Sequence, residues 1–199
     1  MIKNISPLPN FLINRYNDWK SNVYLDKSNK FKKLASLGQN PIAMIISCCD
    51  SRILASSIFG AEEGEFFIHR NIGNLIPPFS NDLLENGTAA AIEYATKVLK
   101  VKHIIILGHT NCGGVKSGYD LFKNKKKSNY IFINKWLEII LPAFKNITNT
   151  TSEKNQIKLL EEESIKNSIN NLFSFPNVKQ DISKNDIFVH GLIHDIGSG

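Results

Sequence analysis

A cysteine, an aspartate and an arginine follow a short apolar run at two-residue spacing. The run, IAMIIS at residues 42–47, leads to Cys48, Asp50 and Arg52. In an extended chain the side chains at i, i+2 and i+4 point to one side, so these three would face one pocket if strand geometry continues. Cys49 would then point the other way, and we interpret it as a packing residue. A buried cysteine beside a surface ion pair is the alternative interpretation.

A second apolar run, HIIILG at residues 103–108, leads to a histidine and another cysteine, His109 and Cys112. Two thiolates and one imidazole suit Zn²⁺, which binds cysteine and histidine in tetrahedral sites. Because only three convincing ligands are present, the fourth position falls to water or to Asp50. An open fourth position is typical of catalytic zinc, whereas a structural site normally has a closed set of four. For His109, a structural histidine in a turn is the alternative.

Both runs are too short for helices and indicate buried strands that end where the reactive side chains begin. Open α/β sheets place their ligands at the carboxyl ends of parallel strands. The alternation of strands and helices predicts an α/β fold with a mostly parallel four-stranded central sheet, an added C-terminal edge strand and helices on both faces. The expected strands are 42–47, 66–68, 103–108 and 187–193, and the expected helices are about 87–100, 114–125, 130–144, interrupted or bent by Pro142, and 153–173.

The segment before the first strand indicates a helical arm. Between residues 9 and 37, Phe11, Leu12, Tyr16 and Trp19 recur at helical spacing, and a similar apolar stripe continues after a turn near 24–28. We expect one domain, residues 1–199, whose N-terminal arm at 1–37 packs on a partner subunit.

Composition narrows the class of protein. The chain has 199 residues, of which 42% are hydrophobic and 21% are charged, as in a soluble globular domain. An apolar run of the ~18 residues needed to span a membrane is missing, and the first residues do not read as a secretory signal. Three clustered cysteines do not form a disulfide framework, which favours the cytoplasm. The net charge of +6 comes partly from lysines at 123–127 without interleaved aromatics, so we expect no nucleic-acid partner.

The motifs together identify a family resemblance. Cys-x-Asp-x-Arg, HRNIGN, GTAAAIEYA and GHTNCGG follow one another between about residues 34 and 118, and VHGLIHDI stands at 189–196. This pattern resembles the β-class carbonic anhydrases. The resemblance implies an obligate homodimer or a homotetramer that interconverts CO2 and bicarbonate. It also implies one Zn²⁺ per subunit, held by Cys48, His109 and Cys112, and a dyad of Asp50 and Arg52.

The expected reaction is zinc-dependent, reversible hydration of CO2 to bicarbonate and a proton. Asp50, ionised and held by Arg52, would accept a hydrogen bond from zinc-bound hydroxide and orient it for attack on CO2. If Arg52 releases it, Asp50 would become a fourth zinc ligand and close the site. Bicarbonate-inhibited bacterial relatives carry a tryptophan three residues before the first zinc cysteine. Ile45 stands there in this chain, which favours the open, three-ligand form.

Two further residues are assigned to the substrate pocket by resemblance, and a third by its apolar side chain. Gln39 matches a glutamine that lines the pocket of plant-type members, and the backbone N–H of Gly113 would orient a bicarbonate oxygen. Phe67 would form part of a nonpolar wall for CO2. An ordinary turn glutamine and a core phenylalanine are the respective alternatives for Gln39 and Phe67.

Two other chemistries lack a residue or motif that they require. A cysteine phosphatase requires an arginine six residues after Cys112, and Gly118 stands there instead. A nucleotide-binding module requires a glycine-rich phosphate motif, which does not follow the strand at 103–108. Two alternatives stay open on the same fold, a hydrolase of carbon disulfide or carbonyl sulfide and a non-catalytic zinc-binding homologue. Intact Asp50, Arg52 and Gln39 favour CO2.

Overall fold

The computed structural model describes residues 6–80, 85–125, 129–147, 152–184 and 186–199. By its internal contacts the chain divides into two compact units, Met1–Gln39 and Asn40–Gly199, which are described separately below. Lys126 and Lys127 of the basic stretch lie outside the described residues. No helix among the described residues is both long enough and apolar enough to cross a membrane.

The first unit consists of helices, in agreement with the predicted arm. Helix α1 spans Asn10–Trp19, a π-helical turn η1 spans Lys20–Tyr24, and α2 spans Ser28–Leu37. Trp19 holds the turn together, because its ring lies 5.7 Å from that of Tyr24 and 5.9 Å from that of Phe31. No residue of these three helices is buried. Packing of this arm on a partner subunit stays a prediction.

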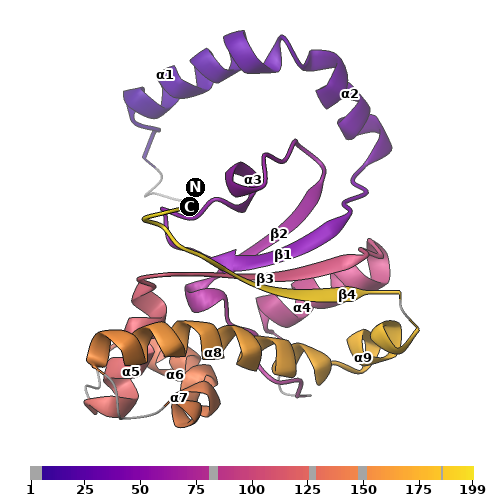
Figure 1. Cartoon of the computed structure of the whole chain (residues 1–199). Coiled ribbons are helices and arrows are strands. Elements are labelled where there is room, and N and C mark those ends of the chain that lie inside the picture. Colours follow the sequence, from indigo (N-terminus) through magenta and orange to yellow (C-terminus); the bar gives the residue numbers. More distant parts are fainter. Residues whose placement is uncertain (1–5, 81–84, 126–128, 148–151, 185) are drawn as a thin grey trace. The chain divides into compact units, whose positions relative to one another are not determined.

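The second unit is built on a four-stranded parallel sheet (Figure 1). Its strands are β1 (Ala43–Cys48), β2 (Phe66–Asn71), β3 (His103–His109) and β4 (Phe188–His194). They lie in the order β2-β1-β3-β4, and every neighbouring pair is parallel. The predicted α/β class is confirmed, with the C-terminal strand at one edge. Because β1 and β3 are neighbours and run in the same direction, their carboxyl ends lie side by side.

Helices connect the strands. They are α3 (Ala55–Ile58), α4 (Gly87–Glu93) with its π-helical continuation η4 (Tyr94–Val98), α5 (Gly113–Lys123), α6 (Ile131–Leu137), α7 (Leu141–Asn146), α8 (Glu153–Phe173) and α9 (Pro176–Ser183), with short 3₁₀ turns η2 (Ile72–Asn74) and η5 (Glu138–Ile140). The segment 130–144, predicted to be interrupted or bent by Pro142, is interrupted, because η5 separates α6 from α7. Pro142 lies in the first turn of a new helix, α7, where its missing N–H has no intrahelical partner to lose. Helix α9 was not predicted.

The two faces of the sheet bury different clusters. Met44 and Ile46 of β1 face the side covered by α4, α8 and α9, which Figure 1 shows beneath the sheet, and both are fully buried there. Ile45 points to the opposite face, where it packs with Ile53 and Leu107 near α3. The alternation along β1 therefore buries both faces, which explains why its sequence reads as an almost continuous apolar run.

The approach of α8 to the sheet depends on a glycine. A Cβ added at Gly108 of β3 would lie 2.6 Å from Cδ1 and 2.9 Å from Cγ1 of Ile165 on α8. Ile165 also occupies the space over Gly191 of β4, where an added Cβ would lie 2.9 Å from its Cγ2. Close packing here fixes the distance between α8 and the end of β3.

We expect Gly108→Ala to lower the free energy of unfolding by about 1–3 kcal/mol, the usual cost of overpacking a core. Urea unfolding followed by circular dichroism measures this loss. Gly87→Ala is the control, because a Cβ at Gly87 meets no atom within 4 Å, and we expect its unfolding midpoint to match or exceed that of the wild type. Equal midpoints for Gly108→Ala and the wild type would contradict the prediction.

Candidate metal centre

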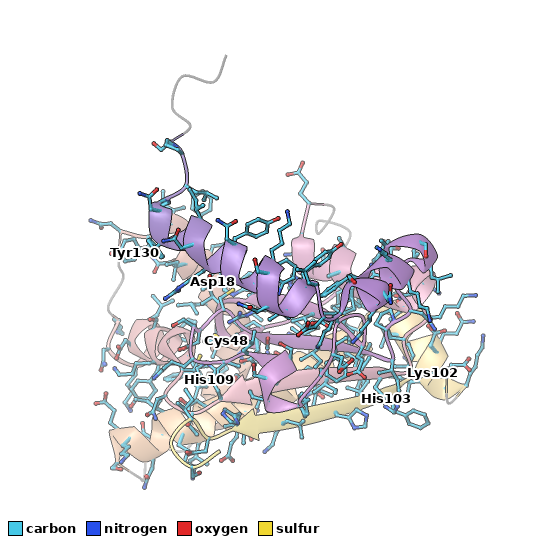
Figure 2. All side chains as sticks on the ribbon, turned by 90° about the horizontal axis from the view of Figure 1, so that it is seen from above. Asp18, Cys48, Lys102, His103, His109 and Tyr130 are labelled. Atoms are coloured by element: carbon cyan, nitrogen blue, oxygen red, sulfur yellow. The ribbon has the colours of Figure 1, made fainter. Side chains whose placement is uncertain are left out.

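The structure brings the three predicted zinc ligands together. Cys48 ends β1, His109 ends β3, and Cys112 immediately precedes α5. One ligand atom from each lies within 4.8 Å of the other two, all three residues are buried, and the two sulfurs are 3.9 Å apart. Figure 2 shows Cys48 and His109 side by side, whereas His103 lies at the other end of β3.

The hydrogen bonding of the His109 imidazole leaves one ring nitrogen available to bind a metal. Its Nδ1 lies 3.0 Å from the carbonyl oxygen of Thr110. Because a carbonyl can only accept, Nδ1 carries the proton in this hydrogen bond and Nε2 is left with a lone pair. Nε2 is buried and has no hydrogen-bond partner among the residues that the structure describes. A buried acceptor without a partner is costly, and a cation between Nε2 and the two sulfurs would satisfy it. The donor set therefore fits Zn²⁺.

The cysteine sulfurs lie among backbone N–H groups that favour thiolates. The N–H of Gly73 donates to Sγ of Cys48 at 3.4 Å. The hydrogen bond from Cys112 lowers the pKa of Cys48 to about 4, and the same interaction raises the pKa of Cys112. One proton is thus shared between two sulfurs, and a divalent cation would replace it. The other N–H groups directed at these sulfurs are those of Asp50, Gly114 and Val115.

Asp50 and Arg52 form a bidentate ion pair beside the cluster. Arg52 donates from Nε to Oδ1 at 2.9 Å and from Nη2 to Oδ2 at 2.7 Å, and its backbone N–H donates to Oδ1 at 3.0 Å. These hydrogen bonds hold the pKa of Asp50 well below its usual range. Oδ2 also lies 3.9 Å from Nε2 of His109, so the carboxylate faces the metal ligands.

The route to this pairing differs from the one expected. Strand β1 ends at Cys48, and Arg52 lies in a turn, so strand alternation does not extend over residues 48–52. Cys49 is exposed, and the interpretation of it as a packing residue was wrong. Side chains meet here because the turn folds Arg52 back onto Asp50.

Sequence reasoning assigned no role to Arg70, which holds this turn. From β2 its guanidinium donates to the backbone oxygens of Cys48, Asp50 and Ile53, at 3.0, 2.8 and 2.9 Å. An arginine provides five donors in a fixed arrangement, which suits a turn with several unpaired carbonyls. Its place in the HRNIGN motif was visible in the sequence, but its partners were not.

Glu161 of α8 was also missed. It is 4% exposed, and its Oε1 accepts a hydrogen bond from the backbone N–H of Cys112 at 2.9 Å. Burial raises the pKa of this carboxyl, and the N–H of Cys112 partly offsets that effect. The sequence signal was helical spacing, since Glu161, Ile165, Ser168 and Leu172 share one buried face.

The residues predicted for the substrate pocket do not all lie near the cluster. Gly113 directly follows Cys112 and begins α5. Phe67 pairs in register with Met44, four residues before Cys48 and therefore ~13 Å along the strand. Gln39 is exposed and is the last residue of the first unit. Their substrate roles stay predictions.

A cleft of about 950 Å³ lies beside the cluster. Its lining residues Cys49 and Ile72 are close in sequence to Cys48 and to Gly73, which donates to the Cys48 sulfur. Trp136 also lines the cleft and donates from Nε1 to the carbonyl oxygen of Ile72 at 2.8 Å. Its lining is largely apolar and includes Ile72, Pro77, Ile131, Phe132, Ile133, Trp136 and Ile139, with His69, Asn71 and Thr88 among the polar groups.

Comparison with known proteins agrees with this geometry. A family model described as carbonic anhydrase matches residues 43–199. Beta carbonic anhydrase 3 of Arabidopsis thaliana is 33% identical over 184 residues, which are 91% of this chain and 70% of that protein.

Two solved structures are similar over most of the chain. The β-carbonic anhydrase CcaA superposes with a TM-score of 0.87 and 28% identity, covering 94% of this chain and 83% of that one. A tetrameric β-carbonic anhydrase of Sordaria macrospora gives a TM-score of 0.81 and 30% identity over 94% and 92% of the two chains.

Proposed function

The chain belongs to the β class of the carbonic anhydrase family, and on that premise we propose that it binds one Zn²⁺ and catalyses the reversible hydration of CO2 to bicarbonate and a proton. The observation that carries this proposal is the unpartnered, buried Nε2 of His109 facing two cysteine sulfurs. We assign Cys48, His109 and Cys112 as the ligands. Bound Zn²⁺ would supply the Lewis acidity that brings the pKa of a coordinated water towards ~7.

Asp50 orients the nucleophile in this proposal. Its Oδ2 faces the position enclosed by the three ligands, where it can accept a hydrogen bond from an attacking water or hydroxide and turn a lone pair towards CO2. Because Arg52 holds the pKa of Asp50 well below its usual range, the carboxylate stays ionised at neutral pH and acts only as an acceptor.

The same contacts support the open form of the site. Arg52 engages both oxygens of Asp50, so binding of this carboxylate to the metal would require breaking a bidentate ion pair. Ile45, at the position of the tryptophan in inhibited relatives, is fully buried in the core beneath α3. We therefore propose that three protein ligands and the solvent position form the resting site.

The apolar cleft suits a nonpolar substrate such as CO2. We propose that the N–H of Gly113 orients a bicarbonate oxygen, and that Gln39 and Phe67 line the pocket. Because Phe67 lies at the far end of β2 from Cys48, its role would require a second copy of the chain. A homodimer or homotetramer is supported by the tetrameric relative, and the arm at 1–37 is proposed to pack on the partner. Cytoplasmic location stays a prediction.

Stopped-flow hydration of CO2 on zinc-quantified protein tests this function. We expect about one zinc per chain and hydration well above the buffer rate across pH ~6.5 to ~9, the range in which the coordinated water titrates. Zinc-loaded protein without hydration would contradict the proposal. Assays with carbon disulfide and carbonyl sulfide would then separate a sulfide-substrate hydrolase from a non-catalytic zinc protein.

A further inference from the structure

The peptide group between Asn111 and Cys112 links the end of β3 to a proposed zinc ligand. It joins β3 to α5 and carries the ligand Cys112 on its nitrogen side. Asn111 has a left-handed backbone with φ of +55°, which is uncommon for a residue other than glycine. Cys112 is the N-cap residue of α5, and its sulfur faces both the cluster and the N–H groups of Gly114 and Val115. The two polar atoms of the 111–112 peptide itself are held by other groups.

Charged side chains hold this peptide at both of its polar atoms. Its oxygen, the carbonyl of Asn111, accepts from Nη2 of Arg52 at 3.1 Å. Its N–H, that of Cys112, donates to Oε1 of Glu161 at 2.9 Å. A continuous series of hydrogen bonds thus runs from Asp50 through Arg52 and the peptide to Glu161. Charge-assisted bonds at both ends polarise the peptide in the same direction, which strengthens each of them.

Glu161 is rigidly placed for this contact. It is 4% exposed on α8, and that helix is fixed against the sheet where Ile165 fits between Gly108 and Gly191. The acceptor therefore comes from an element whose distance to β3 is set by close packing. Arg52, in contrast, is on an exposed turn.

We propose that Glu161 is a positioning residue for both the zinc ligand Cys112 and Arg52 of the dyad, acting through the 111–112 peptide. This inference rests on the proposed function, because it takes Cys112 as a zinc ligand. Fixing the plane of the peptide fixes the N–Cα bond of Cys112 and so limits the positions that its sulfur can take. It also fixes the carbonyl that Arg52 bonds while it holds Asp50.

Three variants of the full chain test the proposal. Glu161→Leu keeps the approximate size and removes the acceptor, Glu161→Gln keeps an acceptor oxygen, and Glu162→Leu is the matched control on the same helix. Glu162 makes no hydrogen bond to the ligand loop within the described part of the chain. Zinc affinity is measured by chelator competition, and the absorption of Co²⁺-loaded protein reports the geometry of the thiolate ligands independently of activity.

We expect Glu161→Leu to weaken zinc binding by about 10–100-fold, the usual cost of losing an outer-shell partner, and to shift the Co²⁺ thiolate bands. Glu161→Gln should remain within about threefold of the wild type, since its amide oxygen still accepts the N–H, and Glu162→Leu should be unchanged. If Glu161→Leu does not fold, Glu161→Asp takes its place, because the shorter side chain withdraws the carboxylate from the N–H and should weaken zinc binding too.

Two results would overturn the proposal, and they are distinguishable. The role of Glu161 would be overturned if a folded Glu161→Leu protein kept wild-type zinc affinity and wild-type Co²⁺ bands. The same holds for Glu161→Asp where that variant replaces Glu161→Leu. Either result would leave the proposed function intact. Wild-type protein that binds no zinc, or whose affinity is unchanged by Cys112→Ser, would overturn the ligand assignment and the role of Glu161 with it.

Discussion

Replacement of Cys112 by serine is expected to remove zinc from the protein and to abolish CO2 hydration. The site has only three protein ligands, so losing one leaves two, and a serine hydroxyl stays protonated where a thiolate binds. The surrounding N–H groups of Gly114 and Val115 are directed at the sulfur. We expect the loss of zinc affinity to exceed the ~100-fold that removal of an outer-shell partner costs. Metal analysis after dialysis and stopped-flow hydration measure the two losses.

Cys49→Ser is the matched control for this experiment. Cys49 is next to a ligand in the sequence, but its side chain is exposed and it does not belong to the Cys48, His109 and Cys112 cluster. We expect it to retain one zinc per chain, because it removes no ligand. Stoichiometric zinc in Cys112→Ser, or loss of zinc in Cys49→Ser, would show that the ligands are wrongly assigned.

Much of the fold could be predicted because its signals are local. Strand β1 is displaced by one residue from the predicted run, and α8 begins and ends where predicted, at 153 and 173. Both have uninterrupted patterns, an apolar run in β1 and helical spacing in α8. Whether 130–144 is bent or interrupted was left open, because Pro142 is compatible with either a bend or a new helix start. The structure divides the segment into α6, η5 and α7.

The metal ligands could be predicted because they follow strand ends, and parallel strands bring those ends together. The groups that orient them could not, because their partners are distant in the sequence. Arg70 bonds carbonyls 17 to 22 residues away, and Glu161 bonds an N–H 49 residues away. Three consecutive glutamates at 161–163 look alike in the sequence, and only helical phase distinguishes the buried one. Such contacts depend on how α8 and β2 pack, which local pattern does not specify.

Asp50→Asn is expected to separate zinc binding from catalysis. Asp50 is held by Arg52 and lies 3.9 Å from Nε2 of His109, so it is outside the ligand set but faces it. An asparagine presents one oxygen and one NH2 group, which loses the bidentate pairing with Arg52 and can turn a donor towards the nucleophile. We expect kcat/KM for CO2 to fall on the order of 10²-fold or more, as when a preorganised polar group is removed from an active site. Zinc should remain at one per chain.

The pH dependence of this loss follows from the direction of the pKa shift. Arg52 holds the folded-state pKa of Asp50 below its unfolded value of about 3.9, so the carboxylate is ionised, and its ion pair intact, everywhere above that value. The stabilisation from the pair disappears only as pH falls through the lowered pKa. Between pH ~6.5 and ~9, where the coordinated water titrates, Asp50 does not change its charge. Asp50 therefore adds no ionisation step of its own to the pH profile of kcat/KM in that range, and we expect the rate of Asp50→Asn to be reduced throughout it.

Asp186→Asn serves as the control for Asp50→Asn, because Asp186 is an exposed partner of Lys102, 3.9 Å away, at the opposite end of the sheet. It should hydrate CO2 at the wild-type rate. Full hydration by zinc-loaded Asp50→Asn would contradict the orienting role, and loss of zinc from that variant would make Asp50 a ligand in the resting state. Retained zinc with a reduced rate is the outcome expected of a carboxylate that lies beside the metal rather than on it, as the bidentate contact with Arg52 indicates.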